Sequence, residues 1–266
     1  MTSRTNPRLR AAAALRDRGE REARGLTLVD GSREVSRALA AGATLVEAFV
    51  CEPLLRTADA RSAVGALLDA GVPRVSVSRA AFDRVAFGER SDGIVAVARI
   101  PSTGLDEVAA GLPDDPLVVV LEAVEKPGNL GAVLRSADGA GANAVIAASP
   151  QTDIWNPNAI RASLGTIFAL PLASAPSGEV ATWLRARGIA IVAARVDGGI
   201  AYDTVDLTGP CAIVLGSEAH GLSDAWLGED VTAVRLPMLG VADSLNVSTA
   251  AAVLLYESRR QRDARG

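Results

Sequence analysis

Three short segments near the carboxyl end of the chain constrain the fold more than any other part of the sequence. Residues 211–215 form an apolar run that stops at Gly216, a pattern typical of a buried strand leading into a tight loop. A second predicted strand, residues 232–236, ends at a proline, and the apolar residues 238–242 that follow have no helical or strand period. Ser244 then stands at the expected N-cap of a long helix. We therefore expect two loops and a helix start to meet at a pocket.

The rest of the chain alternates predicted strands with predicted helices, which indicates α/β architecture with a largely parallel sheet in the second half. Residues 1–103 are expected to form a small α/β domain with a basic arm, and residues 114–266 a second domain. Residues 101–116, rich in proline and glycine, are the expected linker. Predicted strands lie at 26–29, 46–51, 75–77, 94–100, 117–121, 145–148 and 189–194, and predicted helices at 8–24, 32–41, 60–70, 80–87, 129–138, 159–165 and 179–187.

The motifs of the second half resemble those of a known family. Gly216-Ser-Glu, Leu236-Pro-Met and Ser244-Leu-Asn-Val-Ser are similar to motifs two and three of the SpoU group of SPOUT methyltransferases. Residues 128–135 (GNLGAVLR) resemble motif one of the same group. The resemblance implies transfer of a methyl group from S-adenosylmethionine to a ribose 2′-hydroxyl of RNA. It also implies a homodimer and a deep trefoil knot, with the last helix passing through a loop.

The first half is similar to the substrate-binding domain that precedes the catalytic domain in many SpoU enzymes. Residues 25–29 (GLTLV) and the helix predicted after Gly31 carry that likeness. The domain resembles a small ribosomal-protein fold that binds RNA, so the resemblance implies an RNA partner for this half of the chain.

The same resemblance implies roles for particular residues. It places Arg135, Asn129, Glu218, Ser244 and Asn246 on the catalytic face, and Ala194, Gly216, Leu236, Met238 and Leu245 around the adenine of the methyl donor. A guanidinium with a pKa above about 12 is a poor base, so Arg135 is expected to orient the hydroxyl and stabilise the forming alkoxide. Asn129 and Ser244 also have a purely structural interpretation, because either could cap a helix.

The residue inventory limits other chemistries. The chain has one histidine, one lysine and two cysteines in separate apolar runs, so no metal site is expected, and Cys51 and Cys211 are predicted to be reduced core residues. The histidine, His220, is interpreted as a loop residue without a catalytic role, and Lys126 either as a phosphate contact or as a product of arginine bias. No apolar segment is long enough to cross a membrane and no leader is evident, which predicts a cytoplasmic enzyme.

The charge distribution does not decide whether the basic ends of the chain contact RNA. The net charge is −4, yet residues 1–24 carry +4 and residues 259–266 carry +3. These basic ends suit phosphate contacts at a confined surface, and equally suit solvated termini.

Three alternatives remain at this stage. A noncatalytic RNA-binding protein of the same fold, a base-modifying SPOUT enzyme and a transfer RNA methyltransferase compete with a ribosomal RNA 2′-O-methyltransferase. Lys126, where many relatives have an acid, and Leu164, where some resistance enzymes have an arginine, leave the RNA target uncertain. Residues 139–144 (GAGANA) match a dinucleotide-binding pattern, but the order helix, glycines, strand favours helix termination at Gly139 and Gly141.

Overall fold

A computed structural model describes residues 6–87 and 91–265 of the 266-residue chain. It divides into two compact units. Unit 1 comprises Met1–Pro101 and Trp155–Ala169, and unit 2 comprises Ser102–Ile154 and Leu170–Gly266. The break at Pro101 lies where the sequence places the linker. The return of residues 155–169 to unit 1 was not anticipated, because the sequence assigns that segment to the second domain.

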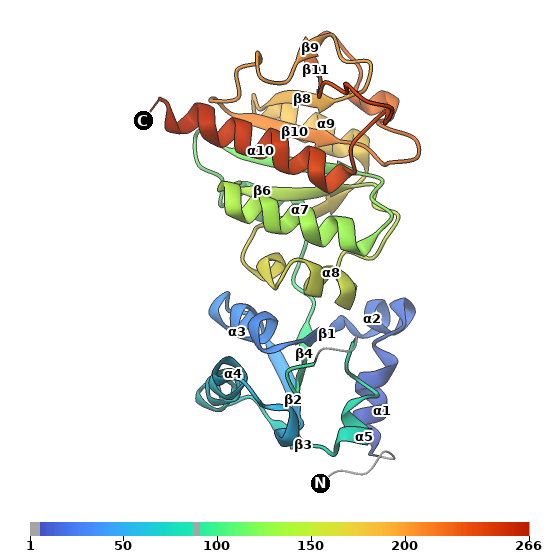
Figure 1. Ribbon diagram of the computed structural model, residues 1–266, viewed down its shortest axis with the longest axis vertical. Helices are drawn as coiled ribbons and strands as arrows, with labels where there is room; N and C mark the ends of the chain where they lie inside the picture. The colour runs from blue at the N-terminus through green and yellow to red at the C-terminus, as the bar shows by residue number, and fades with distance from the viewer. Residues whose placement is uncertain (1–5, 88–90, 266) are drawn as a thin grey trace. The chain divides into compact units, whose positions relative to one another are not determined.

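Unit 1 is built on a mixed four-stranded sheet in the order β1-β4-β2-β3. Strand β4 pairs antiparallel with β1 and β2, while β2 and β3 are parallel. The strands are β1 (Leu26–Asp30), β2 (Leu45–Val50), β3 (Arg74–Ser76) and β4 (Ile94–Arg99). The α-helices are α1 (Pro7–Ala14), α2 (Arg18–Arg24), α3 (Ser32–Ala40), α4 (Ala58–Asp69), α5 (Arg79–Phe82) and α8 (Pro157–Ala162). Figure 1 shows these helices placed around the sheet.

The predicted single helix at residues 8–24 is wrong, because the chain turns between α1 and α2. Asp17 caps α2 by accepting a hydrogen bond from the backbone N–H of Glu20 at 3.2 Å. Leu9 and Leu15 are fully buried in the core of unit 1. The segment expected to be a basic arm is therefore packed into the unit, which gives its arginines local structural contacts.

Residues 155–169 are held to unit 1 by polar contacts. Thr27 Oγ1 donates to the carbonyl of Trp155 at 2.7 Å, and Arg37 Nη1 donates to the carbonyl of Leu164 at 2.8 Å. Arg161 Nη1 lies 3.1 Å from Asp30 Oδ2. Burial of Asp30 raises its pKa to about 6, even though Arg161 and a backbone N–H favour the carboxylate.

Unit 2 contains a seven-stranded sheet in the order β7-β6-β5-β10-β8-β11-β9, and every pairing in it is parallel. The strands are β5 (Leu117–Glu122), β6 (Ala144–Ala148), β7 (Leu172–Ala175), β8 (Ala190–Ala194), β9 (Ile200–Ala201), β10 (Cys211–Leu215) and β11 (Val231–Arg235). β5 and β10 are wholly buried, as continuous apolar runs predict. β7 and β9 were missed because they are short.

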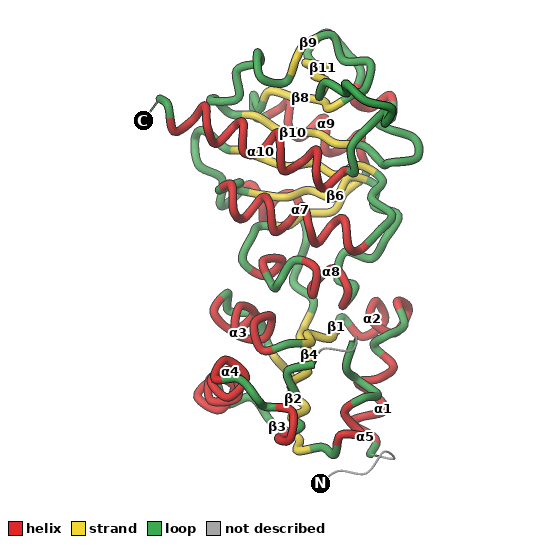
Figure 2. The backbone as a smooth tube through the Cα atoms, in the orientation of Figure 1, coloured by secondary structure: helices red, strands yellow, loops and turns green. Residues whose placement is uncertain are grey.

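Strand order reverses between β5 and β10. The chain runs outward from β5 through β6 to β7, and then builds the other half of the sheet on the far side of β10. In open α/β sheets, ligands bind outside the carboxyl ends of the strands at such a reversal. Figure 2 shows loops gathered at the end of unit 2 where α7 and α10 begin.

The helices of unit 2 cover both faces of the sheet. Helices α7 (Pro127–Ala140) and α10 (Val247–Asp263) lie side by side on one face, and α9 (Ser177–Ala186) packs on the other (Figure 1). Within the predicted linker, α6 (Leu105–Ala109) packs against unit 2. Gly141 terminates α7 in the left-handed conformation at φ 74°, as predicted, whereas Gly139 lies inside the last turn.

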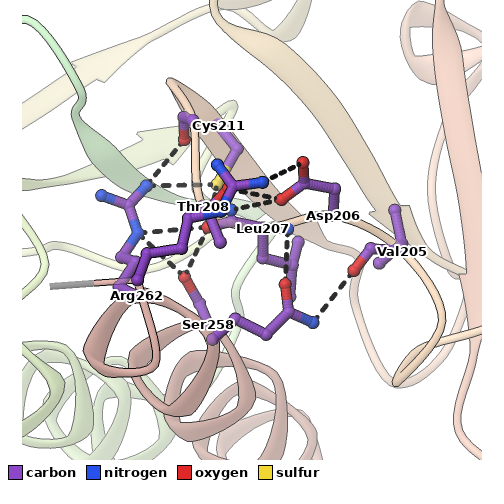
Figure 3. Close-up of polar contacts among 10 residues, drawn as sticks. Val205, Asp206, Leu207, Thr208, Cys211, Ser258 and Arg262 are labelled. Atoms are coloured by element: carbon purple, nitrogen blue, oxygen red, sulfur yellow. Dashed lines mark hydrogen bonds and ion pairs between the residues drawn. The ribbon is translucent and has the colours of Figure 1, made fainter.

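The carboxyl end of α10 is held by a polar cluster, which we call the Arg262 cluster (Figure 3). Arg262 donates from Nε to the carbonyl of Leu207 at 3.1 Å and from Nη2 to the carbonyl of Gly209 at 2.7 Å. Ser258 Oγ donates to the same Leu207 carbonyl at 3.1 Å, and Gln261 Nε2 to that of Val205 at 3.0 Å. The cluster ties α10 to the loop that precedes β10.

Both helix starts differ from the expected ones. α10 is capped by Asn246, whose Oδ1 accepts from the backbone N–H of Ser248 at 2.9 Å, so the capping interpretation of Ser244 is wrong. α7 begins at Pro127, which places Asn129 inside the first turn and not at the cap. The Nδ2 groups of both asparagines remain available for other contacts. The trefoil knot stays a prediction.

Two further expectations concern the cysteines and membranes. Cys51 and Cys211 are free and buried, as predicted. Among the described helices, none combines the length and apolar character needed to cross a bilayer.

Candidate active site

The loop after β10 is a tight turn that depends on a glycine. Ser217 and Gly221 form a two-way backbone bridge, with N···O distances of 3.2 and 2.9 Å. A Cβ atom on Gly216 would lie 2.2 Å from the backbone of Gly221, so only glycine fits. The turn carries Glu218 to the carboxyl edge of the sheet, beside the loop that follows β5.

Glu218 is the centre of a polar cluster built from three separate segments. Lys126 Nζ donates to its Oε2 at 3.0 Å, and Asn129 Nδ2 donates to its Oε1 at 3.1 Å. Asn246 Nδ2 donates to the same Oε1, and lies 3.4 Å from Asn129 Oδ1. The hydrogen bond from Lys126 lowers the pKa of Glu218 below its ordinary value. We call these four residues the Glu218 cluster.

The Glu218 cluster is open to solvent. The side chains of Lys126 and Glu218 are 68% and 31% exposed. An ion pair this exposed contributes little to stability, at most about 1 kcal/mol. Its exposed donors and acceptors are suited to contacting a ligand that carries hydroxyl and phosphate groups.

A pocket of about 810 Å³ opens beside this cluster, under the ends of β8, β10 and β11. All five residues predicted to surround the methyl donor line it: Ala194, Gly216, Leu236, Met238 and Leu245. Glu218 and Ser244 also line it. Ligand pockets of several hundred cubic ångströms with an apolar lining and a few polar groups are the usual small-molecule sites.

A smaller cavity of about 200 Å³ lies on the other side of Glu218. It is lined by the ends of β5 and α7, including Lys126 and Asn129, and it shares Gly216 and Glu218 with the larger pocket. The Glu218 cluster therefore stands between the two spaces.

The structure does not bring Arg135 to the Glu218 cluster. Arg135 is exposed, about two helical turns beyond Asn129 and on a different side of α7. Its guanidinium makes no hydrogen bond or ion pair to another residue within the described ranges, and it lines neither pocket. The resemblance places Arg135 and Asn129 on one catalytic face, and within one chain their side chains share no hydrogen bond in the described ranges.

Two groups near the pocket were missed by sequence reasoning. Arg195 and Asp197, on the loop after β8, form a bidentate ion pair with both N···O distances at 2.9 Å and line the larger pocket. Glu122, the last residue of β5, is 4% exposed and accepts two hydrogen bonds from Ser223. An acid that ends an otherwise apolar run is a sequence signal that could have identified Glu122.

His220 and Lys126 line the larger and the smaller pocket respectively. The backbone N–H of His220 donates to Ser217 Oγ at 3.1 Å. Lys126 contacts Glu218, an ion pair that the sequence did not foresee. No group of three or more histidine, cysteine or acidic side chains among the described residues is arranged to hold a metal ion.

Comparison with known proteins agrees with this geometry. Residues 116–256 match the SpoU rRNA Methylase family, and residues 6–96 match the MRM3-like substrate binding domain. These ranges correspond to most of unit 2 and most of unit 1, although residues 155–169 fall inside the first match while packing in unit 1.

Individual relatives share the chain's sequence and fold. A 23S rRNA (uridine(2479)-2′-O)-methyltransferase of Streptomyces viridochromogenes is 38% identical over 66% of this chain and 63% of its own length. The 23S rRNA (guanosine-2′-O-)-methyltransferase RlmB of Bordetella pertussis is 37% identical over 68% of this chain and 75% of its own length. The crystal structure of AviRb from S. viridochromogenes with AdoMet superposes with a TM-score of 0.86, 31% identity and coverage of 97% and 99% of the two chains.

Proposed function

Because the chain belongs to the SpoU rRNA methylase family, we propose that it transfers a methyl group from S-adenosylmethionine to a ribose 2′-hydroxyl of ribosomal RNA. One observation carries the proposal. Side chains from the starts of α7 and α10 converge on Glu218 at the rim of an 810 Å³ apolar pocket, at the reversal point of a parallel sheet. Methyl transfer needs such a neighbouring pair of sites, because donor and acceptor must be held in line.

The larger pocket is the proposed site of the methyl donor. Leu236, Met238 and Leu245 offer apolar surface for the adenine, and Ala194 and Gly216 allow close approach to the backbone. S-adenosylmethionine supplies an electrophilic methyl group, which the acceptor oxygen takes as the S–C bond breaks. The described residues form no metal cluster that would assist this chemistry, and we propose that donor binding is independent of metal.

The Glu218 cluster is the proposed binding site for the acceptor nucleotide. Asn129 and Asn246 have amide groups directed at one carboxylate, and Lys126 brings a positive charge that can meet a phosphate. Ser244, at the rim of the larger pocket, completes this catalytic face. The acceptor hydroxyl loses its proton as the O–C bond forms, and this proton passes to water or to a phosphate oxygen.

Arg135 is the proposed stabiliser of negative charge on the acceptor oxygen. Within one chain its guanidinium is exposed and does not reach the pocket, so a second copy has to bring it to the reacting atoms. We therefore propose a homodimer. Exposed apolar side chains just before α10 and within it, Leu245 at 37% and Tyr256 at 54%, support a contact there.

Subunit complementation tests this arrangement. Arg135→Ala and Leu245→Asp chains are mixed after partial unfolding and refolded together. If the two residues serve one site from different chains, the mixed dimer transfers methyl groups faster at limiting donor concentration than either variant does alone. Monomeric behaviour in light scattering at micromolar concentration, with full activity, would overturn the dimer.

The RNA target distinguishes the main proposal from its alternatives. The relatives above are named for uridine and guanosine in 23S rRNA, so we propose ribosomal RNA as substrate, in the cytoplasm, without assigning the base. Labelled methyl donor is incubated with the protein and with purified ribosomal or transfer RNA, followed by nucleoside mass spectrometry. A 2′-O-methyl nucleoside from ribosomal RNA is expected. Label in transfer RNA would support a transfer RNA methyltransferase, and label on a base would support a base-modifying enzyme. No label in any RNA would support a noncatalytic RNA-binding protein.

A further inference from the structure

Glu122 occupies a central place at the edge where the two proposed sites meet. It is the last residue of β5, next to β10 at the reversal of strand order. Its side chain is buried, with the residue 4% exposed. A buried carboxylate is costly unless hydrogen bonds compensate for lost water, so its partners identify what it holds.

Those partners belong to the loop that carries Glu218. The backbone N–H of Ser223 donates to Glu122 Oε2 at 2.7 Å, and Ser223 Oγ donates to Glu122 Oε1 at 2.6 Å. Both carboxylate oxygens are thus used by one residue, which fixes the end of the 216–223 loop in position and orientation. Tying down that end limits the movement of Glu218, which lies five residues earlier.

Two further donors complete the surroundings of this carboxylate. Desolvation acts to raise the pKa of Glu122, but hydrogen bonds from Ser177 and Ser223 outweigh it and leave the pKa below its ordinary value. The buried indole Nε1 of Trp226 also favours the carboxylate, although its geometry falls short of a hydrogen bond. The group is therefore charged throughout the neutral range.

The residue after Glu122 turns the chain toward the other half of the site. Ala123 has φ 50°, a left-handed conformation that costs a non-glycine residue free energy. Its N–H donates to the carbonyl of Ala148 at 2.9 Å, which holds the strained turn in place. Beyond this turn lie two members of the Glu218 cluster, Lys126 at the N-cap of α7 and Asn129 in its first turn.

We propose that Glu122 is a positioning residue that sets the Glu218 loop against the start of α7, so that Glu218 meets Asn129 and Asn246. The inference rests on the proposed methyl transfer. Glu122 also lines the smaller cavity beside Glu218, and the role proposed for it is to hold the loop through Ser223. Ser223 accordingly shares the positioning role of Glu122.

The test compares Glu122→Gln and Ser223→Ala, singly and together, with Ser258→Ala as a matched control. Ser258 also donates one buried hydroxyl hydrogen bond in unit 2, but to the carbonyl of Leu207 in the Arg262 cluster. Each protein is assayed by single-turnover methyl transfer at saturating RNA, by calorimetry with S-adenosylmethionine, and by hydrogen exchange of the 216–227 peptide.

Glu122→Gln is expected to slow methyl transfer at least tenfold and to speed exchange in the 216–227 peptide, with donor affinity changed less than threefold. The double variant is expected to be no slower than Glu122→Gln, because both changes release the same tie. Ser258→Ala should leave rate and loop exchange at wild-type values. An additive double variant, or Glu122→Gln with wild-type loop exchange, would overturn the proposal.

The exchange measurement separates this inference from the proposed function. If the wild type methylates no RNA, the proposed function fails, and loop exchange still decides whether Glu122 holds the loop. If the wild type is active and Glu122→Gln transfers within threefold of it, the positioning role fails while the function stands.

Discussion

The two ends of α10 are both held by polar side chains, yet they use them in opposite ways. At the carboxyl end, Arg262 and Ser258 donate to the backbone carbonyl of the buried residue Leu207. At the amino end, Asn246 donates to the side chain of Glu218, which is partly exposed at the rim of a pocket.

This difference distinguishes a structural cluster from a functional one. The backbone carbonyl of a buried residue such as Leu207 must find a donor, so the Arg262 cluster is explained by the fold alone. The amides of Asn129 and Asn246 and the ammonium of Lys126 satisfy no backbone group through their contacts with Glu218. We propose that their convergence serves to bind the acceptor nucleotide.

Among the variants that test this comparison, those at Arg135 are expected to change the rate of methyl transfer most. Arg135→Ala should slow methyl transfer by roughly 100- to 1,000-fold, because losing one donor aimed at developing charge costs about 2.7 to 4 kcal/mol. Its exposed side chain makes no described contact, so the thermal midpoint and donor affinity should not change. Single-turnover transfer at saturating enzyme measures the chemical step.

Arg135→Lys is the companion variant. An ammonium cannot reproduce the planar fork that contacts phosphate and hydroxyl together, so the lysine should rescue poorly. If Arg135→Ala transfers within about threefold of wild type, less than roughly 1 kcal/mol of barrier, Arg135 is a surface residue.

The reverse pattern is expected at the other end of α10. Arg262→Ala leaves the carbonyls of Leu207 and Gly209 short of a donor and should lower the free energy of unfolding by about 1 to 3 kcal/mol. Methyl transfer at a temperature where the variant is folded should stay within threefold of wild type. Denaturant titration and the same transfer assay provide both numbers. A hundredfold slower methyl transfer with an unchanged free energy of unfolding would contradict the purely structural role of the Arg262 cluster.

A smaller effect is expected at Leu245, in the loop that leads into α10. Leu245→Asp places a charge on the apolar lining of the larger pocket and should weaken donor binding about tenfold, close to 1.4 kcal/mol. RNA affinity should hardly change, since Leu245 is outside the Glu218 cluster. Calorimetry for the donor and filter binding for RNA separate the two. Equal loss of both would indicate misfolding, and a chelator-sensitive donor affinity would contradict metal-free binding.

The sequence predicted most of unit 2 because its signals are local. Apolar runs such as β5 and β10 and the left-handed stop at Gly141 depend on neighbouring residues, and the five residues expected around the methyl donor line one pocket. The helix caps were misjudged because Ser244 and Asn246 are equally good caps in isolation. Which of the two caps the helix was decided by tertiary contacts.

Long-range contacts explain the other failures. The tie between Glu122 and Ser223 spans 101 residues, and the return of residues 155–169 to unit 1 depends on Thr27 and Asp30. No periodicity encodes such pairs. The basic arm shows the same limit, since its composition is visible in the sequence but the use of each arginine is not.

The smallest predicted effect concerns the basic segment at residues 1–24, where arginines bonded to backbone carbonyls can be compared with an exposed arginine. Arg21 and Arg24 donate to backbone carbonyls within unit 1, at 2.8 and 2.7 Å, as Arg262 does in unit 2. The side chain of Arg10 makes no hydrogen bond or ion pair to another residue in the part of the chain that the structure describes, and the residue is exposed. If RNA phosphates approach this surface, Arg10 is available to meet them and Arg24 is already engaged.

Arg10→Ala should therefore reduce the slope of log affinity against log salt by about 0.7 to 0.9, the loss of one phosphate contact, whereas Arg24→Ala should leave the slope unchanged. Point variants are needed because deleting residues 1–24 would remove the buried Leu9 and Leu15. RNA binding measured by filter retention between 50 and 200 mM salt gives both slopes. Equal slopes for Arg10→Ala and wild type would mean that the exposed arginine is merely solvated. A reduced slope for Arg24→Ala would show that an arginine bonded to a backbone carbonyl can still contact RNA, which would break the rule drawn from the two ends of α10.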